Sequence, residues 1–258
     1  MAWPNLRGGD RNLAVRALQS AMARELARLG VRHRNTGNGT YGKGLAADVH
    51  AWKQAQRIAP TTGTVFGQAA WRKLWPRMTR RERRWVVTTR AQLAAKAAAK
   101  RAAAAAERVL RRRQTVANAA LDLYAKGRAV LVYTQRRPFP LTWSVRELRY
   151  RLDCSSTVTL CYWRGGAPDP NGYGFTGRTD AYGWTGSLWP RGERVDIPQP
   201  GDLAFYGWDS ARRAPKHVAI VVTGLPSVQV VTFGHTPISR TFLRYRGDLI
   251  GVRRYPME

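Results

Sequence analysis

Two kinds of residue are scarce in this 258-residue chain, and their scarcity narrows what the protein can be. There are only two cysteines, Cys154 and Cys161. On a helix their Cα atoms would lie about 10.5 Å apart, which is beyond disulfide reach. Acidic residues number 16 against 44 Lys and Arg, leaving a formal net charge of +28. Such a charge predicts an anionic partner: nucleic acid, a membrane surface or an acidic cell-wall polymer.

Long apolar segments are also missing. No stretch approaches the roughly 18 uninterrupted apolar residues that a membrane-spanning helix needs. Residues Met1 to Asp10 lack the basic cap, apolar run and small-residue cleavage site of a secretory signal. We therefore expect no integral membrane segment and no signal peptide. If the protein acts outside a cytoplasm, something else must release it.

Gly and Pro are absent between Pro76 and Gly127, and eleven of the sixteen residues from Ala91 to Ala106 are Ala, the best helix former. We predict a basic, Ala-rich helical linker over residues 77–114. Its large apolar residues lie near its ends, so its centre lacks the stripe that buries a helix face. A solvated spacer is one interpretation, and a cationic grip on an anionic polymer is the other.

Residues 1–76 show helical periodicity interrupted by turns, which predicts a small three-helix bundle. The helices are indicated, in chain order, by Leu13 to Met22, by Val49 to Gln56 and by Gly67 to Leu74.

The same residues resemble the peptidoglycan-binding domain found on many cell-wall hydrolases. The matching motifs are Gly9, Val15-Arg16-Ala17-Leu18-Gln19, Thr40-Tyr41-Gly42, Asp48 to Gln54, Gly63 to Gly67 and Ala70-Trp71-Arg72-Lys73-Leu74. The chain departs from the family pattern at Gly39-Thr40, which lacks the usual acidic residue, and at Phe66, inserted before Gly67. The resemblance implies wall binding, for which Tyr41, Trp52 and Trp71 are the candidate residues.

Residues 115–258 predict an α+β domain, because helical patterns precede a series of strands. A first helix is expected over Val116–Ala125, a second opens at Cys154, and a loop rich in Gly and aromatics runs from Gly165 to Pro200. Strands are predicted at Asp202–Tyr206, His217–Val222, Val228–Phe233 and Leu249–Arg253. We expect this loop to form one side of a substrate-binding groove.

Cys154 and His217 are the residues best placed for nucleophilic catalysis. Cys154 begins a predicted helix, where backbone N–H groups and the helix dipole stabilise a thiolate. His217 opens a hydrophobic strand, so its imidazole at a sheet end can deprotonate a thiol on a facing helix. His33 and His50 have no metal-ligand spacing, and we predict no metal site and no cofactor.

Three motifs together resemble the NlpC-type papain-like cell-wall peptidases: Asp153-Cys154-Ser155-Ser156, Gly201-Asp202-Leu203 with Phe205-Tyr206, and His217-Val218-Ala219-Ile220. Cys154 to Trp163 with Gly166 to Gly172 are similar in particular to catalytic domains of endolysins from phages of actinobacteria. The resemblance implies a papain-like domain with Cys154 as nucleophile, His217 as general base and Tyr133 near the reacting carbonyl. Asp153 and Ser155 are expected to position the oxyanion or the substrate.

The third catalytic position is open. Enzymes of this family place a His, Asn or Gln on the strand after the base, where it holds the imidazole tautomer. Val231, Phe233 and His235 share one strand face by period two, and His235 is the polar candidate. In the phage group the polar residue often precedes a glycine, where this chain has Phe233 before Gly234. Either His235 takes the role or the enzyme works as a dyad.

The resemblances imply a phage endolysin that cleaves the peptidoglycan stem peptide, between D-glutamyl and diaminopimelyl residues, for host cell lysis. The alternatives are an N-acetylmuramoyl-L-alanine amidase, a virion-associated lysin, and a non-catalytic wall- or DNA-binding protein. Expected partners are peptidoglycan and anionic wall polymers, with no specific nucleic acid. We expect a monomer that stays in the host cytoplasm until lysis and then acts at the host cell wall.

Overall fold

The computed structural model describes residues 3–35, 37–59, 62–136, 139–175 and 183–258. The chain divides into two compact units, Met1–Ala103 and Ala104–Glu258. The first is mainly helical and the second combines helices with an antiparallel sheet, which confirms the predicted mixture of helix and sheet. Of the helices in the described ranges, none combines the length and apolarity needed to cross a lipid bilayer.

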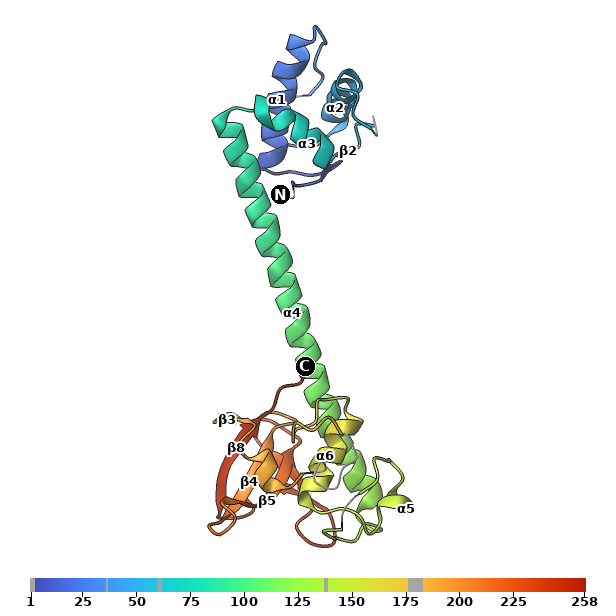
Figure 1. The fold of residues 1–258 in the computed structure, drawn as a ribbon, viewed down its shortest axis with the longest axis vertical. Coiled ribbons are helices and arrows are strands. Elements are labelled where there is room, and N and C mark those ends of the chain that lie inside the picture. The colour runs from blue at the N-terminus through green and yellow to red at the C-terminus, as the bar shows by residue number, and fades with distance from the viewer. Residues whose placement is uncertain (1–2, 36, 60–61, 137–138, 176–182) are drawn as a thin grey trace. The chain divides into compact units, whose positions relative to one another are not determined.

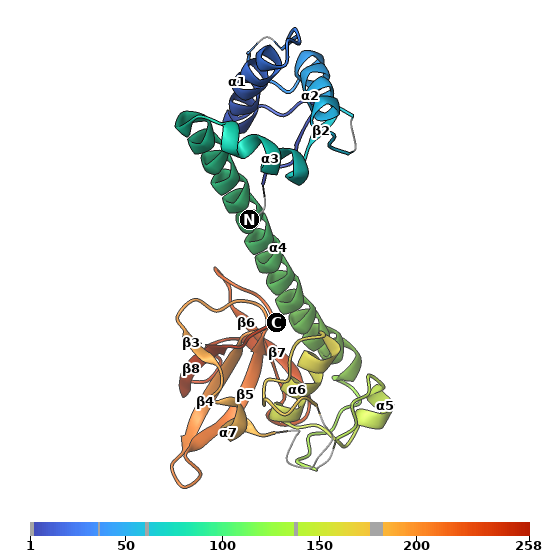
Figure 2. The same ribbon diagram turned by 45° about the horizontal axis from the view of Figure 1, so that its top comes forward.

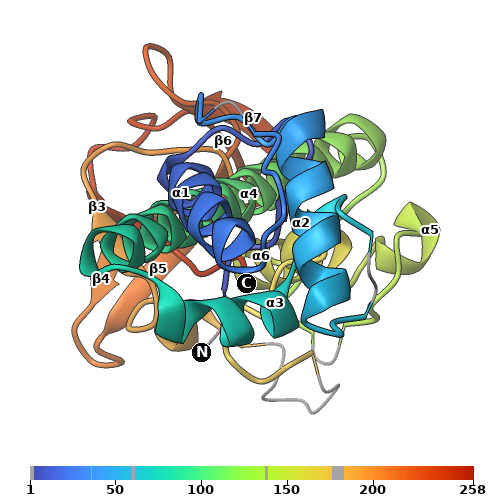
Figure 3. The ribbon, with the colours of Figure 1, turned by 90° about the horizontal axis from the view of Figure 1, so that it is seen from above.

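The first unit packs three helices around one apolar core (Figure 3). These helices are α1 (Leu13–Arg28), α2 (Lys43–Ala55) and α3 (Gln68–Leu74). Asn12 caps α1, because its side-chain oxygen accepts the backbone N–H of Val15 at 3.0 Å. The unit also contains an antiparallel pair of short strands, β1 (Leu6–Arg7) and β2 (Val65–Phe66), and the 3-10 turn η1 (Trp75–Arg77).

Helix α4 (Arg80–Gly127) contributes its first part to the first unit and its last part to the second (Figure 1). Near its start, Thr89 accepts the backbone N–H of Ala14 at 2.9 Å, which ties α4 to α1. The Ala-rich residues 91–104 are exposed, as in a solvated spacer. Arg113, which falls within the predicted linker, is buried in the second unit. That unit therefore includes helical residues that precede its predicted start at residue 115.

The second unit is built on a six-stranded antiparallel sheet with the order β3-β8-β4-β5-β6-β7 (Figure 2). The strands are β3 (Glu193–Val195), β4 (Leu203–Asp209), β5 (Ala214–Val221), β6 (Gln229–Thr232), β7 (Ser239–Phe242) and β8 (Leu249–Arg254). The register pairs Tyr206 with His217 and Ala219 with Thr232. Because side chains alternate along a strand, these four residues lie on the same face of the sheet.

Helices cover the opposite face. Helices α6 (Cys154–Arg164) and α7 (Thr185–Leu188) pack against β5, while α5 (Val145–Leu148) contributes Leu148 to the same core. Phe205 and Val218 belong to this core, and their strand neighbours Tyr206 and Ala219 belong to a smaller cluster on the other face. Alternate side chains of β4 and β5 therefore pack into two apolar clusters, one on each face of the sheet.

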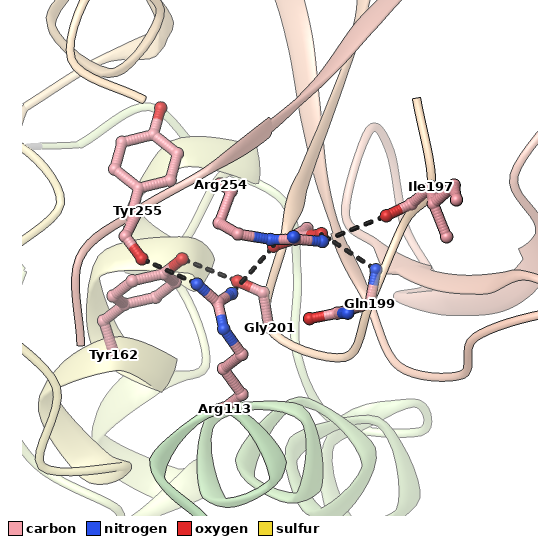
Figure 4. A network of polar contacts seen from close by, with 8 residues as sticks. Arg113, Tyr162, Ile197, Gln199, Gly201, Arg254 and Tyr255 are labelled. Carbon is pink, nitrogen blue, oxygen red and sulfur yellow. Dashed lines mark hydrogen bonds and ion pairs between the residues drawn. The ribbon is translucent and has the colours of Figure 1, made fainter. Parts of the chain in front are cut away.

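A buried ion-pair network joins α4 to the start of β4 and to β8 (Figure 4). The carboxylate of Asp202 accepts from Arg113 Nη1 at 2.8 Å and from Arg254 Nη2 at 2.8 Å. Arg113 also donates to the carbonyl oxygen of Tyr255 at 3.0 Å, and the Tyr162 hydroxyl donates to that of Gly201 at 2.6 Å. The Gly201-Asp202 motif therefore fixes the beginning of β4, the strand paired with the one that carries His217.

Candidate active site

Cys154 is the first residue of α6, and the residues around it hold the helix start in place. Asp153 and Ser156 form a reciprocal capping box: the Asp153 carboxylate accepts the Ser156 N–H at 2.8 Å, and Ser156 Oγ accepts the Asp153 N–H at 2.7 Å. Asp153 also accepts the hydroxyl of Ser155 at 3.1 Å. Both predicted positioning residues therefore contribute to the cap that fixes Cys154.

The two cysteines differ in their surroundings, although both are free thiols. Cys161 lies seven residues further along α6 and is fully buried, and this burial raises the pKa of its thiol far above the ordinary range. Cys154 keeps 7% of its surface exposed and lines a pocket. Only Cys154 is therefore in a position to react with a substrate.

The pocket beside Cys154 has a volume of about 480 Å³. Pro215 and Lys216 line it, and they immediately precede His217 on β5, so the pocket extends from Cys154 to the residues next to His217. Tyr173 and Trp184 from the predicted loop Gly165–Pro200 also line it. Residues 176–182 of that loop lie outside the described residues.

His217 is buried, with 4% of its surface exposed, and its ring is held from the neighbouring strand. Its Nε2 lies 2.6 Å from Thr232 Oγ1, and that oxygen lies 3.2 Å from the hydroxyl of Tyr245. Burial, with a smaller effect of the Arg246 charge, lowers the pKa of His217 to about 4. The carboxylates of Asp248 and Asp153 act in the opposite direction on this pKa. At neutral pH the imidazole is therefore uncharged.

The structure corrects the prediction for the third position. Strand β6 ends at Thr232, and His235 lies beyond it in an exposed bend, so it does not continue the strand face of Val231. The side chain next to the His217 ring nitrogen is that of Thr232. Thr232 is not predictable as this partner from the sequence, because its position next to His217 follows from the register between β5 and β6. Alternation along the predicted strand places Thr232 and Phe233 on different faces of the sheet. It does not show which residue of another strand Thr232 contacts.

Phe233 and Gly234 complete the surroundings of this site. The buried Phe233 ring meets the Tyr133 ring edge-on, with 5.6 Å between centroids. A Cβ at Gly234 would lie only 3.2 Å from Cε1 of His217, so the glycine allows close packing against the imidazole.

Tyr133 lies two residues before Gln135, which lines the pocket. Its backbone bridges to Leu152, two residues before Cys154. Gln135, which lines the pocket, donates to the Tyr133 hydroxyl at 3.4 Å. The backbone N–H of Tyr133 donates to Thr236 Oγ1 at 2.8 Å, which links this segment to the turn after β6.

In the first unit, the three aromatic residues predicted to bind the wall are instead core residues, which corrects that assignment. Trp52 and Trp71 are 0% exposed and Tyr41 is 1% exposed. The Tyr41 hydroxyl donates to the carbonyl oxygen of Gly63 at 2.7 Å, and Trp71 Nε1 donates to that of Pro4 at 2.7 Å. Their large apolar area holds the helices and loops together, and it is not accessible to a polymer in solution.

Comparison with models of known protein families and with curated proteins found no match. Among solved structures, the chain is similar to an NLP/P60 family protein, described as similar to a lipoprotein, from Staphylococcus aureus subsp. aureus Mu50. That match has a TM-score of 0.38 and 20% identity, and it covers 55% of this chain and 41% of that one. An NlpC/P60 family protein from Bacillus cereus ATCC 10987 matches with a TM-score of 0.32 and 24% identity over 53% of this chain and 40% of that one. This chain thus spans about two fifths of each.

Proposed function

We propose that the second unit is a cysteine peptidase that hydrolyses an amide bond in the stem peptide of peptidoglycan. One observation carries the proposal. Cys154 begins a capped helix and lines a pocket together with Pro215 and Lys216, the two residues that precede His217. The imidazole of His217 is buried and neutral, and its Nε2 contacts the Thr232 hydroxyl. The NlpC-type motifs around Cys154 and His217 support the choice of substrate.

In the first half of the proposed reaction, the Cys154 sulfur attacks the carbonyl carbon of the scissile amide. The thiol proton passes to the ring nitrogen of His217 that does not face Thr232, which is Nδ1. Backbone N–H groups and the dipole at the start of α6 stabilise the oxyanion. The imidazolium then gives its proton to the leaving amine as the C–N bond breaks, and a thioester remains on Cys154.

In the second half, water attacks the thioester carbonyl. His217 accepts a proton from this water and returns it to the sulfur as the C–S bond breaks, so the free thiol and a carboxylic acid are formed. The pair starts and ends the cycle neutral, which agrees with a His217 pKa of about 4.

We further propose that the whole chain acts as a phage endolysin, with the bond between D-glutamyl and diaminopimelyl residues as its target. The motifs of the first unit support wall attachment, and the net charge of +28 supports association with anionic wall polymers. The exposed surface of the first unit would make this attachment, since Tyr41, Trp52 and Trp71 are buried.

Purified diaminopimelate-type peptidoglycan, digested with the wild type or with Cys154→Ala, tests the proposal. Mass spectrometry should find new termini at the glutamyl–diaminopimelyl bond with the wild type and none with the variant. Free lactyl groups on muramic acid would instead identify an N-acetylmuramoyl-L-alanine amidase. Equal fragment release by both proteins would show that Cys154 is not the nucleophile.

The second cysteine supplies a matched control. Cys161→Ala removes a thiol from the same helix, seven residues away and fully buried, and should retain cleavage. Iodoacetamide should modify one thiol in the wild type and none in the native Cys154→Ala protein, with loss of activity following the modification.

A further inference from the structure

The hairpin between β4 and β5 brings two cationic side chains to the pocket that contains Cys154. Arg212 lies in the turn of this hairpin, and Lys216 lies on β5 directly before His217. Both side chains belong to residues that line this pocket together with Cys154.

Two acidic residues, Asp153 and Asp209, also line the pocket, and both are engaged in local structure. The Asp209 carboxylate accepts the backbone N–H groups of Ala211 at 3.0 Å and Arg212 at 3.1 Å, which shapes the hairpin turn. Its other oxygen lies 3.9 Å from Arg212 Nε, which is longer than a hydrogen bond. Asp153 caps α6. Neither carboxylate holds the Arg212 guanidinium tightly, and the Arg212 side chain is 75% exposed.

Lys216 is exposed as well, and its ammonium group forms no hydrogen bond or ion pair with another of the described residues. An ammonium and a guanidinium on one pocket wall can together bind a carboxylate by charge-assisted hydrogen bonds. Exposed rings of Tyr173 and Trp184 supply apolar surface to the same pocket. The cavity therefore combines a nucleophile, aromatic surface and two cations, while its two carboxylates accept backbone N–H groups. This arrangement suits a peptide with a free carboxylate near the bond to be cleaved.

We propose that Arg212 and Lys216 form a carboxylate subsite, which makes acidic peptides the substrate class and their amidated forms poor substrates. This inference rests on the proposed peptidase function, because the subsite is part of the same pocket. It assigns a role to two residues outside the catalytic motifs. Because these cations interact with the substrate before reaction, their loss should raise KM more than it lowers kcat.

The test uses pairs of synthetic stem peptides in which one carboxylate at a time is replaced by a carboxamide. The wild type should cleave at least one acid form with a kcat/KM on the order of tenfold above its amide. Arg212→Gln and Lys216→Gln should each reduce that preference severalfold, mainly through a higher KM for the acid form. Equal cleavage of acid and amide by the wild type, at every position, would overturn the subsite.

Arg213→Gln is the matched control, because it removes the same charge from the same hairpin at a residue that is exposed and does not line the pocket. It should leave the preference for the acid form unchanged. Equal losses in all three variants would show that only the overall positive charge matters, and the specific subsite would be wrong.

Binding to Cys154→Ala separates this inference from the proposed function. Calorimetry with the same peptide pairs should show tighter binding of the acid, and this difference should disappear when Arg212→Gln and Lys216→Gln are added. Tighter acid binding without any Cys154-dependent cleavage would refute the peptidase and retain the subsite. If cleavage depends on Cys154 but acid and amide bind equally well, the subsite is refuted and the peptidase function is retained.

Discussion

Thr232 Oγ1 lies 2.6 Å from Nε2 of His217, so the partner of the imidazole is a threonine on the adjacent strand. The same oxygen lies 3.2 Å from the Tyr245 hydroxyl. If Thr232 accepts from Nε2–H and donates to Tyr245, Nδ1 is left as the acceptor for the thiol proton. A hydroxyl in this position can set the tautomer that histidine or an amide sets in the peptidases whose motifs this sequence resembles.

Thr232→Val tests this role, because it keeps the shape and removes the hydroxyl. Loss of one hydrogen bond to a buried partner costs about 1–3 kcal/mol, so kcat should fall about 10- to 100-fold. KM should change little, since Thr232 does not line the pocket. Steady-state kinetics and the nitrogen chemical shifts of His217 measure the effect, and the Val variant should show a mixed tautomer.

Two further variants show whether Thr232 acts through its hydroxyl, which orients the His217 ring, or only through the volume of its side chain. Thr232→Ser retains the hydroxyl and should recover most of the activity. His235→Ala removes the other candidate, which is exposed and outside β6, and should change kcat by less than about threefold. A large loss with His235→Ala, and none with Thr232→Val, would restore His235 to the third position.

The low pKa of His217 sets the acid limit of activity. Only the neutral imidazole accepts the thiol proton, and burial lowers its pKa from 6.5 to about 4. The kcat/KM profile should therefore hold its plateau below pH 6 and fall only as pH approaches 4. Arg246→Gln removes a positive charge that lowers this pKa, so its acid limb should move to higher pH. A wild-type limb near pH 6.5 would contradict the burial argument.

The same shift makes stability depend on pH. The unfolded chain binds a proton at His217 below about pH 6.5, whereas the folded protein resists protonation until about pH 4. Stability is therefore complete above pH 6.5 and decreases as pH falls toward 4, by about 3 kcal/mol in total. Urea titrations at pH 7 and pH 4.5 should show a smaller loss for His217→Gln than for the wild type.

Local chemistry made the main parts of the site predictable from the sequence. An acidic residue before Cys154 and a serine three residues after that acid indicate a capped helix start, which the structure contains. The apolar run after His217 indicates a buried strand, and β5 is buried at nearly every position. These features depend on neighbours in the chain, so periodicity and capping patterns reveal them.

The parts that escaped prediction depend on pairing between distant segments. The edge strands β3 and β7 are short and mostly exposed, so they lack the hydrophobic alternation that indicates a strand. Thr232 faces His217 only because β5 and β6 pair in a particular register. The motif that contains Trp52 does not show whether its aromatic ring faces solvent or the core, and only the packing of the three helices places it in the core.

Asp202 should be a main determinant of stability in the second unit. It is 0% exposed and holds Arg113, whose side chain is 7% exposed, together with Arg254. Asp202→Asn leaves a buried guanidinium without its counter-ion, which should cost about 3–5 kcal/mol. Glu107→Gln breaks an exposed pair with Arg111 and should change stability by less than about 1 kcal/mol. Calorimetric unfolding measures both, and similar Tm values for the two variants would refute the network's importance.

Trp52 separates the structural from the binding interpretation of the first unit. Its side chain is 0% exposed, and its ring centroid lies 5.8 Å from that of Phe66. Its indole N–H has no hydrogen-bond partner among the described residues. Trp52→Ala should therefore unfold the first unit or destabilise it by about 3–5 kcal/mol, as expected for a large cavity. Trp52→Phe removes the unpaired donor and keeps most of the apolar volume, so the fold should survive.

Pelleting with purified cell walls then tests attachment. Trp52→Phe should bind walls like the wild type if exposed, charged surface makes the contact. Raising the salt concentration from about 0.05 M to 0.5 M should weaken binding of both proteins markedly, because it screens the attraction between the +28 chain and anionic wall polymers. If the Trp52→Phe protein folds but does not bind walls, Trp52 takes part in wall binding. Pelleting that does not change with salt would rule out charge as the main attraction.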